Sequence, residues 1–485
     1  MSETSIISFL TKHADKKTVS FHMPGHKGSA IYRRFGYTEF LEKMMDCDIT
    51  EIPGADNLFQ TEGILRAAQE KYAAIYGVKR SYLLINGTSC GVIAAVMASV
   101  PKGKKVVMAR NSHKAIFNSL VLADIQPVYA YPEIIPAYGI SGGITADEIE
   151  RCLTENPDAE SVILPSPNYY GICSDIRAIA EVVHRHGKVL IVDQAHGAHL
   201  KFFQDFGFTS MPESAEQQGA DIVVNSIHKT LASFTQSAVL NLTSDRVDHY
   251  VLEDKLQMLE STSPSYLLMG SLEINAELLK EHGKTLMTEW YEGLMYFYRE
   301  AKNMPGLRLI GSPMDTDAGI RMDITKINLD LSAVGIDGAR LEELLIERGI
   351  YAELTTGPIL MCMTGIGNSM KDMQRLLDAL NDISRSAGVP AAVAAAAAHP
   401  AVNVLKEKLL LFPVPQDKER IPLLEGAGRI CASSIIPYPP GIPFICPGEQ
   451  LTEEVIQYIK KLRDAGEKVI GINDLGEITV ERQLR

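Results

Sequence analysis

A lysine that follows an apolar strand is the residue in this sequence best suited to covalent chemistry. The segment Asp221–Asn225 (DIVVN) predicts a buried strand, and Ser-Ile-His-Lys-Thr comes directly after it. Lys229 is therefore expected at the carboxyl edge of a sheet. Burial lowers the pKa of a lysine and makes its amine a nucleophile that forms Schiff bases with carbonyl compounds. The alternative is an ordinary surface lysine that happens to follow a strand.

An aspartate and two histidines follow another apolar strand, Val189–Val192. By itself Asp193 fits a helix N-cap or a magnesium ligand. Paired with an imine-forming lysine, it would instead keep the pyridine nitrogen of pyridoxal 5'-phosphate (PLP) protonated, which makes that ring an electron sink. His196 and His199, three residues apart, also suggest a metal pair. Because no acidic or thiol third ligand other than Asp193 lies near them in sequence, we expect no metal.

A glycine turn between a strand and a helix suggests a phosphate site. In Leu84–Gly91 (LINGTSCG), Thr88 and Ser89 stand at the start of the predicted helix. Free backbone N–H groups and the positive end of a helix attract a phosphate dianion, and hydroxyls add hydrogen bonds. Ser226 and His228, which precede the lysine, can complete this cup. The pattern is not a Walker loop, and its alternative is a plain N-cap.

A further histidine follows a third strand, Lys105–Ala109 (KVVMA). In Ala109–Lys114 (ARNSHK), His113 has two interpretations. It either belongs to an ordinary polar loop or lies flat on a pyridine ring, since a PLP site needs an aromatic group stacked on the cofactor.

Five short apolar runs separated by amphipathic stretches must position these residues. The predicted strands are Ser81–Asn86, Lys105–Ala109, Ser161–Pro165, Val189–Val192 and Asp221–Asn225. Continuous apolar strands that alternate with helices predict an α/β fold with a mostly parallel sheet covered on both faces. Ligands of such sheets bind at the carboxyl ends of the strands, which is where each candidate residue lies.

The pattern changes along the chain in a way that suggests domains. We predict an N-terminal segment over residues 1–60, a large cofactor-binding domain over 61–305, and a smaller mixed α/β region over 306–485. A low-complexity run, AAVAAAAAHP, marks a joint near residues 388–402.

Composition excludes several classes of protein. A net charge of −13 argues against nucleic acid as a partner, because phosphate-binding proteins present a basic face. The apolar stretches are too short to span a membrane, and the N-terminus lacks the order of a secretory signal. Seven scattered cysteines without a CxxC pair fit a reducing compartment. We therefore expect a cytoplasmic protein.

These motifs together resemble the bacterial ornithine/lysine/arginine decarboxylase family of fold-type I PLP enzymes. The resemblance covers nearly the whole chain and keeps the family's order of motifs. The matching segments are FHMPGHKG (21–28), DITEIPGADNL (48–58), NGTSCG (86–91), RNSHK (110–114), PNYYG (167–171), DQAHGAH (193–199), SIHKT (226–230), TSPSY (262–266) and PYPPGIPFICPGE (437–449). The resemblance implies an aspartate aminotransferase-like large domain, PLP as cofactor, and decarboxylation of a basic amino acid.

The resemblance also implies a role for each matching residue. Lys229 is then the lysine that holds PLP as an imine, Asp193 the partner of the pyridinium nitrogen, and His113 the histidine stacked on the ring. Ala195 packs under the ring, and His196 lies beside its phenolic oxygen or the substrate carboxylate. The residues around the phosphate are Thr88, Ser89, Ser226 and His228, together with Thr262 and Ser263 from a partner subunit. A homodimer would therefore be obligatory.

Two departures from the family pattern bear on the assembly and on one loop. The chain reaches FHMPGHKG by residue 21, without the N-terminal wing domain of the larger, acid-inducible members. It therefore resembles the short branch of biosynthetic arginine decarboxylases, which serve polyamine biosynthesis, and leaves any assembly beyond a dimer open. In PNYYG, Asn168 stands where the family usually has a threonine.

The substrate is a separate question, because PLP chemistry acts only at Cα. A long cationic side chain must be recognised by an acidic group away from the ring, and Glu353 in Gly349–Thr356 (GIYAELTT) is the candidate. Its alternative is a solvated glutamate at a strand end. A guanidinium pairs bidentately with a carboxylate, so the expected order of substrates is arginine, lysine, ornithine. Other fold-type I reactions, such as transamination or aldol cleavage, and a catalytically silent PLP-binding protein are the alternative functions.

Overall fold

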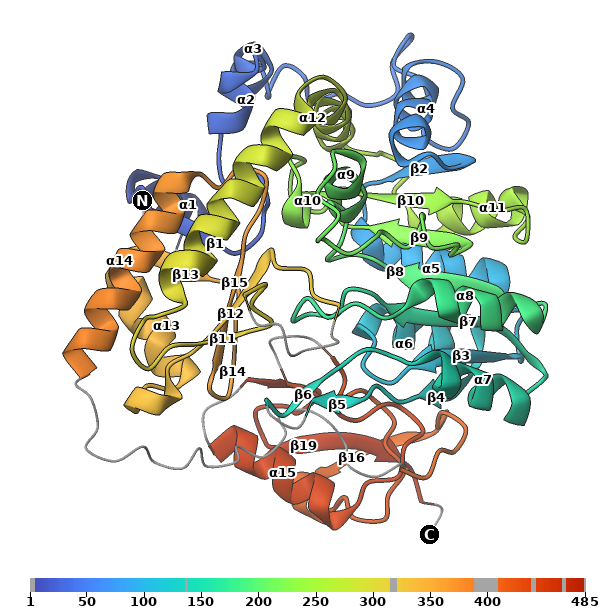
Figure 1. Cartoon of the computed structure of the whole chain (residues 1–485). Coiled ribbons are helices and arrows are strands. Elements are labelled where there is room, and N and C mark those ends of the chain that lie inside the picture. The colour runs from blue at the N-terminus through green and yellow to red at the C-terminus, as the bar shows by residue number, and fades with distance from the viewer. Residues whose placement is uncertain are drawn as a thin grey trace. The chain divides into compact units, whose positions relative to one another are not determined.

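The computed structural model describes residues 5–135, 138–314, 321–387, 409–437, 442–464 and 468–483 (Figure 1). The predicted joint near 388–402 and residues 438–441 of the proline-rich motif lie outside these ranges. The chain forms two compact units. The first comprises Met1–Gly91, Ser166–Arg177 and Val192–His399, and the second comprises Val92–Pro165, Ala178–Ile191 and Pro400–Arg485.

A seven-stranded sheet carries the strands that the sequence predicts. Its order is β2 (Arg80–Leu84), β10 (Ala238–Leu242), β9 (Ile222–Asn225), β8 (Val189–Asp193), β7 (Ala159–Pro165), β3 (Lys105–Ala109) and β4 (Gln126–Ala130). Strand β10 is antiparallel to β2 and β9, whereas β3 is parallel to β4 and β7. The five predicted strands are all present, and the α/β fold with a mostly parallel sheet is confirmed.

Helices begin where strands of this sheet end. Helix α5 (Gly87–Ser99) follows β2, α6 (Lys114–Ala123) follows β3, and α10 (Ile227–Thr230) follows β9. The turn into α5 needs Gly87, whose φ of 73° is one that other residues rarely adopt. The remaining helices of the second unit are α7 (Ala146–Glu155), α8 (Ile176–Arg185), whose first two residues belong to the first unit, and α15 (Glu453–Asp464).

The first unit also contains a four-stranded antiparallel sheet and the longest helix. The sheet order is β11 (Arg308–Ile310), β12 (Lys326–Asp330), β15 (Ile359–Met363) and β14 (Leu354–Thr356). Strand β1 (Val19–Phe21) pairs in parallel with β13 (Ile350–Ala352). Helix α12 (Tyr266–Ala301) packs beside α14 (Met370–Ala387), as Figure 1 shows. The other helices of this unit are α1 (Ile6–Asp15), α2 (Ala30–Arg34), α3 (Thr38–Glu42), α4 (Ile64–Tyr76), α9 (Leu200–Asp205), α11 (His249–Leu259) and α13 (Gly338–Glu347).

The second unit adds three small antiparallel pairs. These are β5 (Ile134–Ile135) with β6 (Ile140–Ser141), β16 (Lys418–Pro422) with β19 (Glu477–Glu481), and β17 (Ile436–Pro437) with β18 (Val469–Ile470). Of the helices in the described ranges, none combines the length and the apolar character needed to cross a bilayer. The predicted domain boundaries at residues 60 and 305 stay predictions.

Candidate active site

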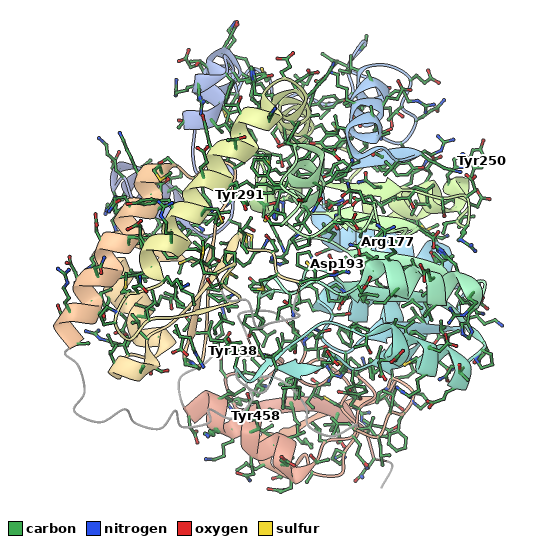
Figure 2. All side chains as sticks on the ribbon, viewed as in Figure 1. Tyr138, Arg177, Asp193, Tyr250, Tyr291 and Tyr458 are labelled. Atoms are coloured by element: carbon green, nitrogen blue, oxygen red, sulfur yellow. The ribbon has the colours of Figure 1, made fainter. Side chains whose placement is uncertain are left out.

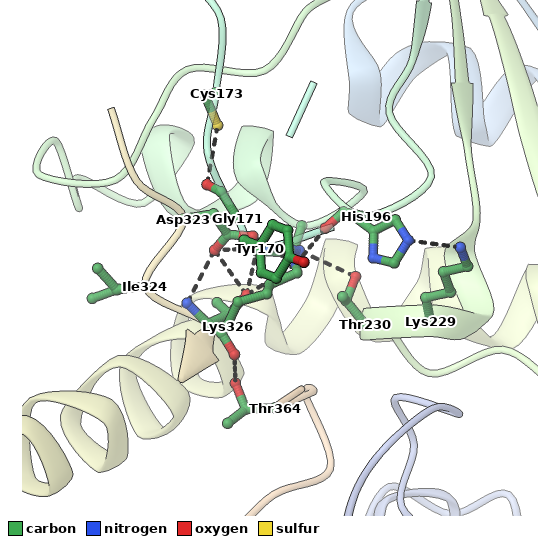
Figure 3. A network of polar contacts seen from close by, with 12 residues as sticks. Tyr170, Gly171, Cys173, His196, Lys229, Thr230, Asp323, Ile324, Lys326 and Thr364 are labelled. Carbon is green, nitrogen blue, oxygen red and sulfur yellow. Dashed lines mark hydrogen bonds and ion pairs between the residues drawn. The ribbon is translucent and has the colours of Figure 1, made fainter. Parts of the chain in front are cut away.

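Lys229 lies in the single turn of α10, directly after β9. Its Nζ is 3.0 Å from Nε2 of His196, which follows the neighbouring strand β8 (Figure 3). Burial lowers the pKa of the Lys229 amine, and the nearby ammonium of Lys326 adds to this, whereas the carboxylates of Asp193 and Glu353 oppose it. An amine with a lowered pKa is available as a neutral nucleophile nearer neutral pH.

Two segments far away in the sequence hold the backbone around this lysine. The N–H of Gly25 donates to the carbonyl of His228 at 2.7 Å, and the N–H of Ile366 donates to the carbonyl of Thr230 at 2.9 Å. A Cβ on Gly25 would come within 2.3 Å of the Thr230 backbone, so only glycine allows this approach. The FHMPGHKG motif therefore supports the lysine segment from within the same chain.

Asp193 is the last residue of β8 and is labelled in Figure 2. Its side chain is buried, and the N–H of Ala195 donates to Oδ1 at 3.1 Å. Burial raises the pKa of this carboxyl, while Lys229 and the Ala195 N–H oppose the rise. A buried carboxylate stays ionised when a cation lies beside it, and the protonated nitrogen of a pyridine ring is such a cation.

Two hydroxyls meet where the phosphate cup is predicted. Oγ1 of Thr88, in the first turn of α5, lies 2.9 Å from Oγ of Ser226, the N-cap residue of α10. No acidic residue stands in the first turn of α5, so its positive end favours an anion. Ser89 is exposed in the same turn. Nδ1–H of His228 donates to the carbonyl of Ser237 at 2.8 Å, and burial lowers the pKa of this imidazole to about 4.

A buried glutamate that the sequence patterns did not reveal holds the backbone just before the predicted phosphate cup. The carboxylate of Glu260 accepts the N–H groups of Ile85 at 3.2 Å and Asn86 at 3.0 Å. Burial raises the pKa of Glu260 to about 7. Thr262 and Ser263, which come next in the chain, are both exposed.

His113 is the N-cap residue of α6, and its Nδ1 accepts the N–H of Ala115 at 3.3 Å. It belongs to the second unit, whereas the other predicted site residues belong to the first. The structure therefore confirms that His113 follows β3 without testing its predicted role.

Glu353 is connected to the lysine through two aromatic residues. Oε1 of Glu353 accepts the hydroxyl of Tyr169 at 3.0 Å, and Oε2 accepts the N–H of Met23 at 2.9 Å. The rings of Tyr169 and His196 lie 4.6 Å apart between centroids, and His196 reaches Lys229. The structure thus brings Glu353 to the same site as Lys229. The sequence indicated Tyr169 only as part of the PNYYG motif, although its position after a strand is one that site residues often occupy.

The donors at this site match the three functional parts of PLP. The amine of Lys229 suits the aldehyde of PLP, and the buried carboxylate of Asp193 suits its ring nitrogen. The hydroxyl pair of Thr88 and Ser226, at the start of a helix, suits its phosphate. Within the described residues, no group of three or more histidine, cysteine or acidic side chains could hold a metal ion. His199 is instead held by Asp323 and Thr230, at 3.1 Å from each.

Comparisons with known proteins agree with this geometry. The profile of the Orn/Lys/Arg decarboxylase major domain matches residues 4–311, and that of the family's C-terminal domain matches residues 395–475. Arginine decarboxylase of Bacillus subtilis is 35% identical over 482 residues, which cover 97% of this chain and 96% of that protein. Arginine decarboxylase of Bacillus anthracis is 32% identical over 490 residues, covering 98% and 96%. The constitutive lysine decarboxylase of Escherichia coli superposes with a TM-score of 0.76 at 22% identity, covering 98% of this chain and 81% of that one.

The fold is that of the lysine decarboxylase structure, and the site carries donors that suit PLP. The chain belongs to the Orn/Lys/Arg decarboxylase family, as the resemblance predicted, and is a PLP-dependent decarboxylase of a basic amino acid.

Proposed function

We propose that this enzyme converts L-arginine to agmatine and CO₂, with lysine and then ornithine as poorer substrates. The observation that supports this order is the position of Glu353, a carboxylate beside the lysine site and hydrogen-bonded by Tyr169. A guanidinium pairs with a carboxylate through two parallel hydrogen bonds, whereas an ammonium offers only a point charge. The full-length Bacillus relatives named as arginine decarboxylases support the same choice.

Each candidate residue has a place in this proposal. Bound PLP supplies an electron sink for the bond that loses CO₂. Lys229 holds the cofactor, Asp193 keeps the ring nitrogen protonated, and His113 stacks on the ring. Lys229 or His228 returns the proton to Cα. The residues placed against the rest of the cofactor are Thr88, Ser89, Ala195, His196, Ser226 and His228.

We further propose an obligate homodimer with Thr262 and Ser263 reaching the partner's phosphate cup. Both residues are exposed in this chain. Helix α1 presents apolar side chains to solvent, with Ile6, Phe9 and Leu10 exposed by 77%, 67% and 57%. Such a patch is typical of an interaction surface. Sedimentation of the full-length enzyme at assay concentration is expected to give a dimer, and an active monomer would refute the proposal.

The cellular setting that we propose is the cytoplasm, with agmatine feeding polyamine biosynthesis. All seven cysteines are free thiols, six of them buried, which suits a reducing compartment. Recovery of the activity in the soluble cytoplasmic fraction of cells is the corresponding measurement.

The substrate proposal is tested by offering arginine, lysine and ornithine separately to wild type and to Glu353→Gln. Wild type is expected to show its highest kcat/KM with arginine, measured as CO₂ and amine released. Glu353→Gln removes the charge that pairs with the guanidinium and is expected to raise KM for arginine about 10- to 100-fold. Its affinity for PLP is expected to stay at the wild-type value.

Glu342→Gln is the matched control for this experiment. Glu342 lies on α13 and accepts the hydroxyl of Thr355, two residues from Glu353. Its substitution is expected to leave KM unchanged. A wild type that prefers lysine, or a Glu353→Gln variant with normal KM for arginine, would contradict the assignment.

A further inference from the structure

Three ionisable side chains are completely buried behind the catalytic lysine. The side chains of His199, Asp323 and Lys326 are each 0% exposed. Nζ of Lys326 lies 2.6 Å from Oδ2 of Asp323 (Figure 3). Nε2 of His199 lies 3.1 Å from Oδ1 of the same carboxylate. Burying an ion pair costs desolvation energy that mutual attraction seldom exceeds. Stability is therefore a poor explanation for this group, and its contacts suggest another.

Lys326 connects Asp323 to one side of Lys229. Its Nζ donates to the backbone carbonyl of His196 at 2.5 Å. The imidazole of the same His196 lies 3.0 Å from Nζ of Lys229. Lys326 thus holds the backbone of the histidine whose side chain contacts Lys229.

His199 connects Asp323 to the other side. Its Nδ1 lies 3.1 Å from Oγ1 of Thr230, the residue that follows Lys229. Trp290 packs against the His199 ring, 5.1 Å away between centroids, and its Nε1–H donates to Thr364 at 2.9 Å. The imidazole therefore has little freedom to turn away from Thr230.

We propose a positioning frame made of Asp323, Lys326 and His199. Asp323 binds both of the other residues: Lys326 holds the backbone of His196, and His199 holds the side chain of Thr230. The inference rests on the proposed role of Lys229. Within the described residues, Lys326 contacts the backbone of His196 and His199 contacts the hydroxyl of Thr230, and neither bonds to the Lys229 amine itself, so they are positioning residues. The frame holds the Lys229 amine and the His196 imidazole at a fixed separation.

The frame also has an electrostatic consequence. Burial alone would raise the pKa of Asp323, but His199 and Lys326 hold it well below its usual range. Asp323 is therefore ionised and offsets the charge of Lys326. The other charged groups that act on Lys229 are Asp193 and Glu353, which favour its protonated form. Removing Asp323 should therefore lower the pKa of Lys229, because the Lys326 cation remains. Removing Lys326 should raise that pKa, because the Asp323 carboxylate remains.

The test measures the rate at which full-length apoenzyme captures added PLP, as a function of pH. Capture needs the neutral amine, so the midpoint of the profile reports the pKa of Lys229. Asp323→Asn leaves the Lys326 cation unbalanced and is expected to move the midpoint down by about one pH unit. Lys326→Met removes that cation and is expected to move it up. In the double variant, Asp323→Asn with Lys326→Met, the midpoint is expected to return towards the wild-type value. Its kcat is expected to be about 10- to 100-fold below wild type, because the frame is absent.

Two further variants distinguish an effect of the frame on the position of Lys229 from effects on its charge and on folding. Thr230→Val removes the hydroxyl at the end of the His199 arm without burying a charge, and is expected to lower kcat with an unchanged midpoint. Asp330→Asn is the control: Asp330 lies on the same strand β12, its side chain is 2% exposed, and it pairs with Arg308. It is expected to leave both the midpoint and kcat near wild type.

The frame is refuted if both single variants move the midpoint in the same direction, or if Asp323→Asn behaves like Asp330→Asn. It is also refuted if Thr230→Val keeps wild-type kcat. Lys229→Ala distinguishes this failure from failure of the proposed function. If that variant captures PLP with the wild-type pH profile, the role of Lys229 is wrong. If it loses capture while the frame variants match wild type, only the frame is wrong.

Discussion

Lys229→Ala is expected to abolish the visible absorbance of bound PLP and to lower turnover at least about 10³-fold. The reason is the position of the amine: it follows β9, lies 3.0 Å from His196, and has a pKa lowered by burial. Its charge also acts on the buried carboxyl of Asp193 and opposes the rise in that group's pKa. Absorbance spectra and steady-state CO₂ release are the measurements.

Lys201→Ala is the matched control. Its side chain is only 12% exposed, and it pairs with Asp205 at 2.8 Å on α9. The control is expected to keep both colour and turnover. Near-normal activity in Lys229→Ala would overturn the interpretation of the whole site.

Asp193→Asn is expected to keep PLP bound and to lower kcat by about 10²- to 10³-fold. The amide can still accept the Ala195 N–H, but it cannot stabilise a protonated ring nitrogen, and the electron sink is weakened. The expected result is a coloured protein with low kcat and little change in the affinity for PLP.

Asp221→Asn provides the comparison for Asp193→Asn. Asp221 is also a buried carboxylate, 1% exposed, but it stands before β9, at the opposite end of the strand from Lys229, and accepts the hydroxyl of Ser244. Its loss is expected to change stability and not kcat. Unchanged turnover in Asp193→Asn would show that Asp193 only caps the backbone at Ala195 and does not act on the ring nitrogen.

Much of the site could be predicted from sequence because its signals are local. Lys229 and Thr88 each follow a strand within a few residues, and Asp193 ends one, so an apolar run and the residues at its end were sufficient. The Thr88–Ser226 contact followed from the rule that parallel strands present their carboxyl ends at one edge. Glu353 could be recognised in the sequence as a lone carboxylate near a strand. Its hydrogen bond with Tyr169 could not be predicted, because the two residues lie far apart in the chain.

The positioning frame could not be predicted because its contacts join distant segments. His199 and Asp323 are 124 residues apart, and the strand after Asp323 belongs to the four-stranded sheet. A signal was present: Asp323 and Lys326 are opposite charges three residues apart, at the start of an apolar strand. Nothing in the sequence alone distinguishes such a pair from two solvated residues. Glu260 was missed for the same reason, since its partners Ile85 and Asn86 lie on a different element.

The two backbone hydrogen bonds beside Lys229 set an order for events on the ribosome. Gly25 is synthesised long before His228, so that contact can form as soon as the lysine segment emerges. Ile366 is made 136 residues after Thr230, and until it leaves the exit tunnel the backbone that follows the lysine lacks its last support. Nascent chains therefore carry the reactive amine well before its surroundings are complete. We therefore expect chains that end before Ile366 to bind PLP more weakly than the full-length protein, because the backbone after Lys229 then lacks this hydrogen bond.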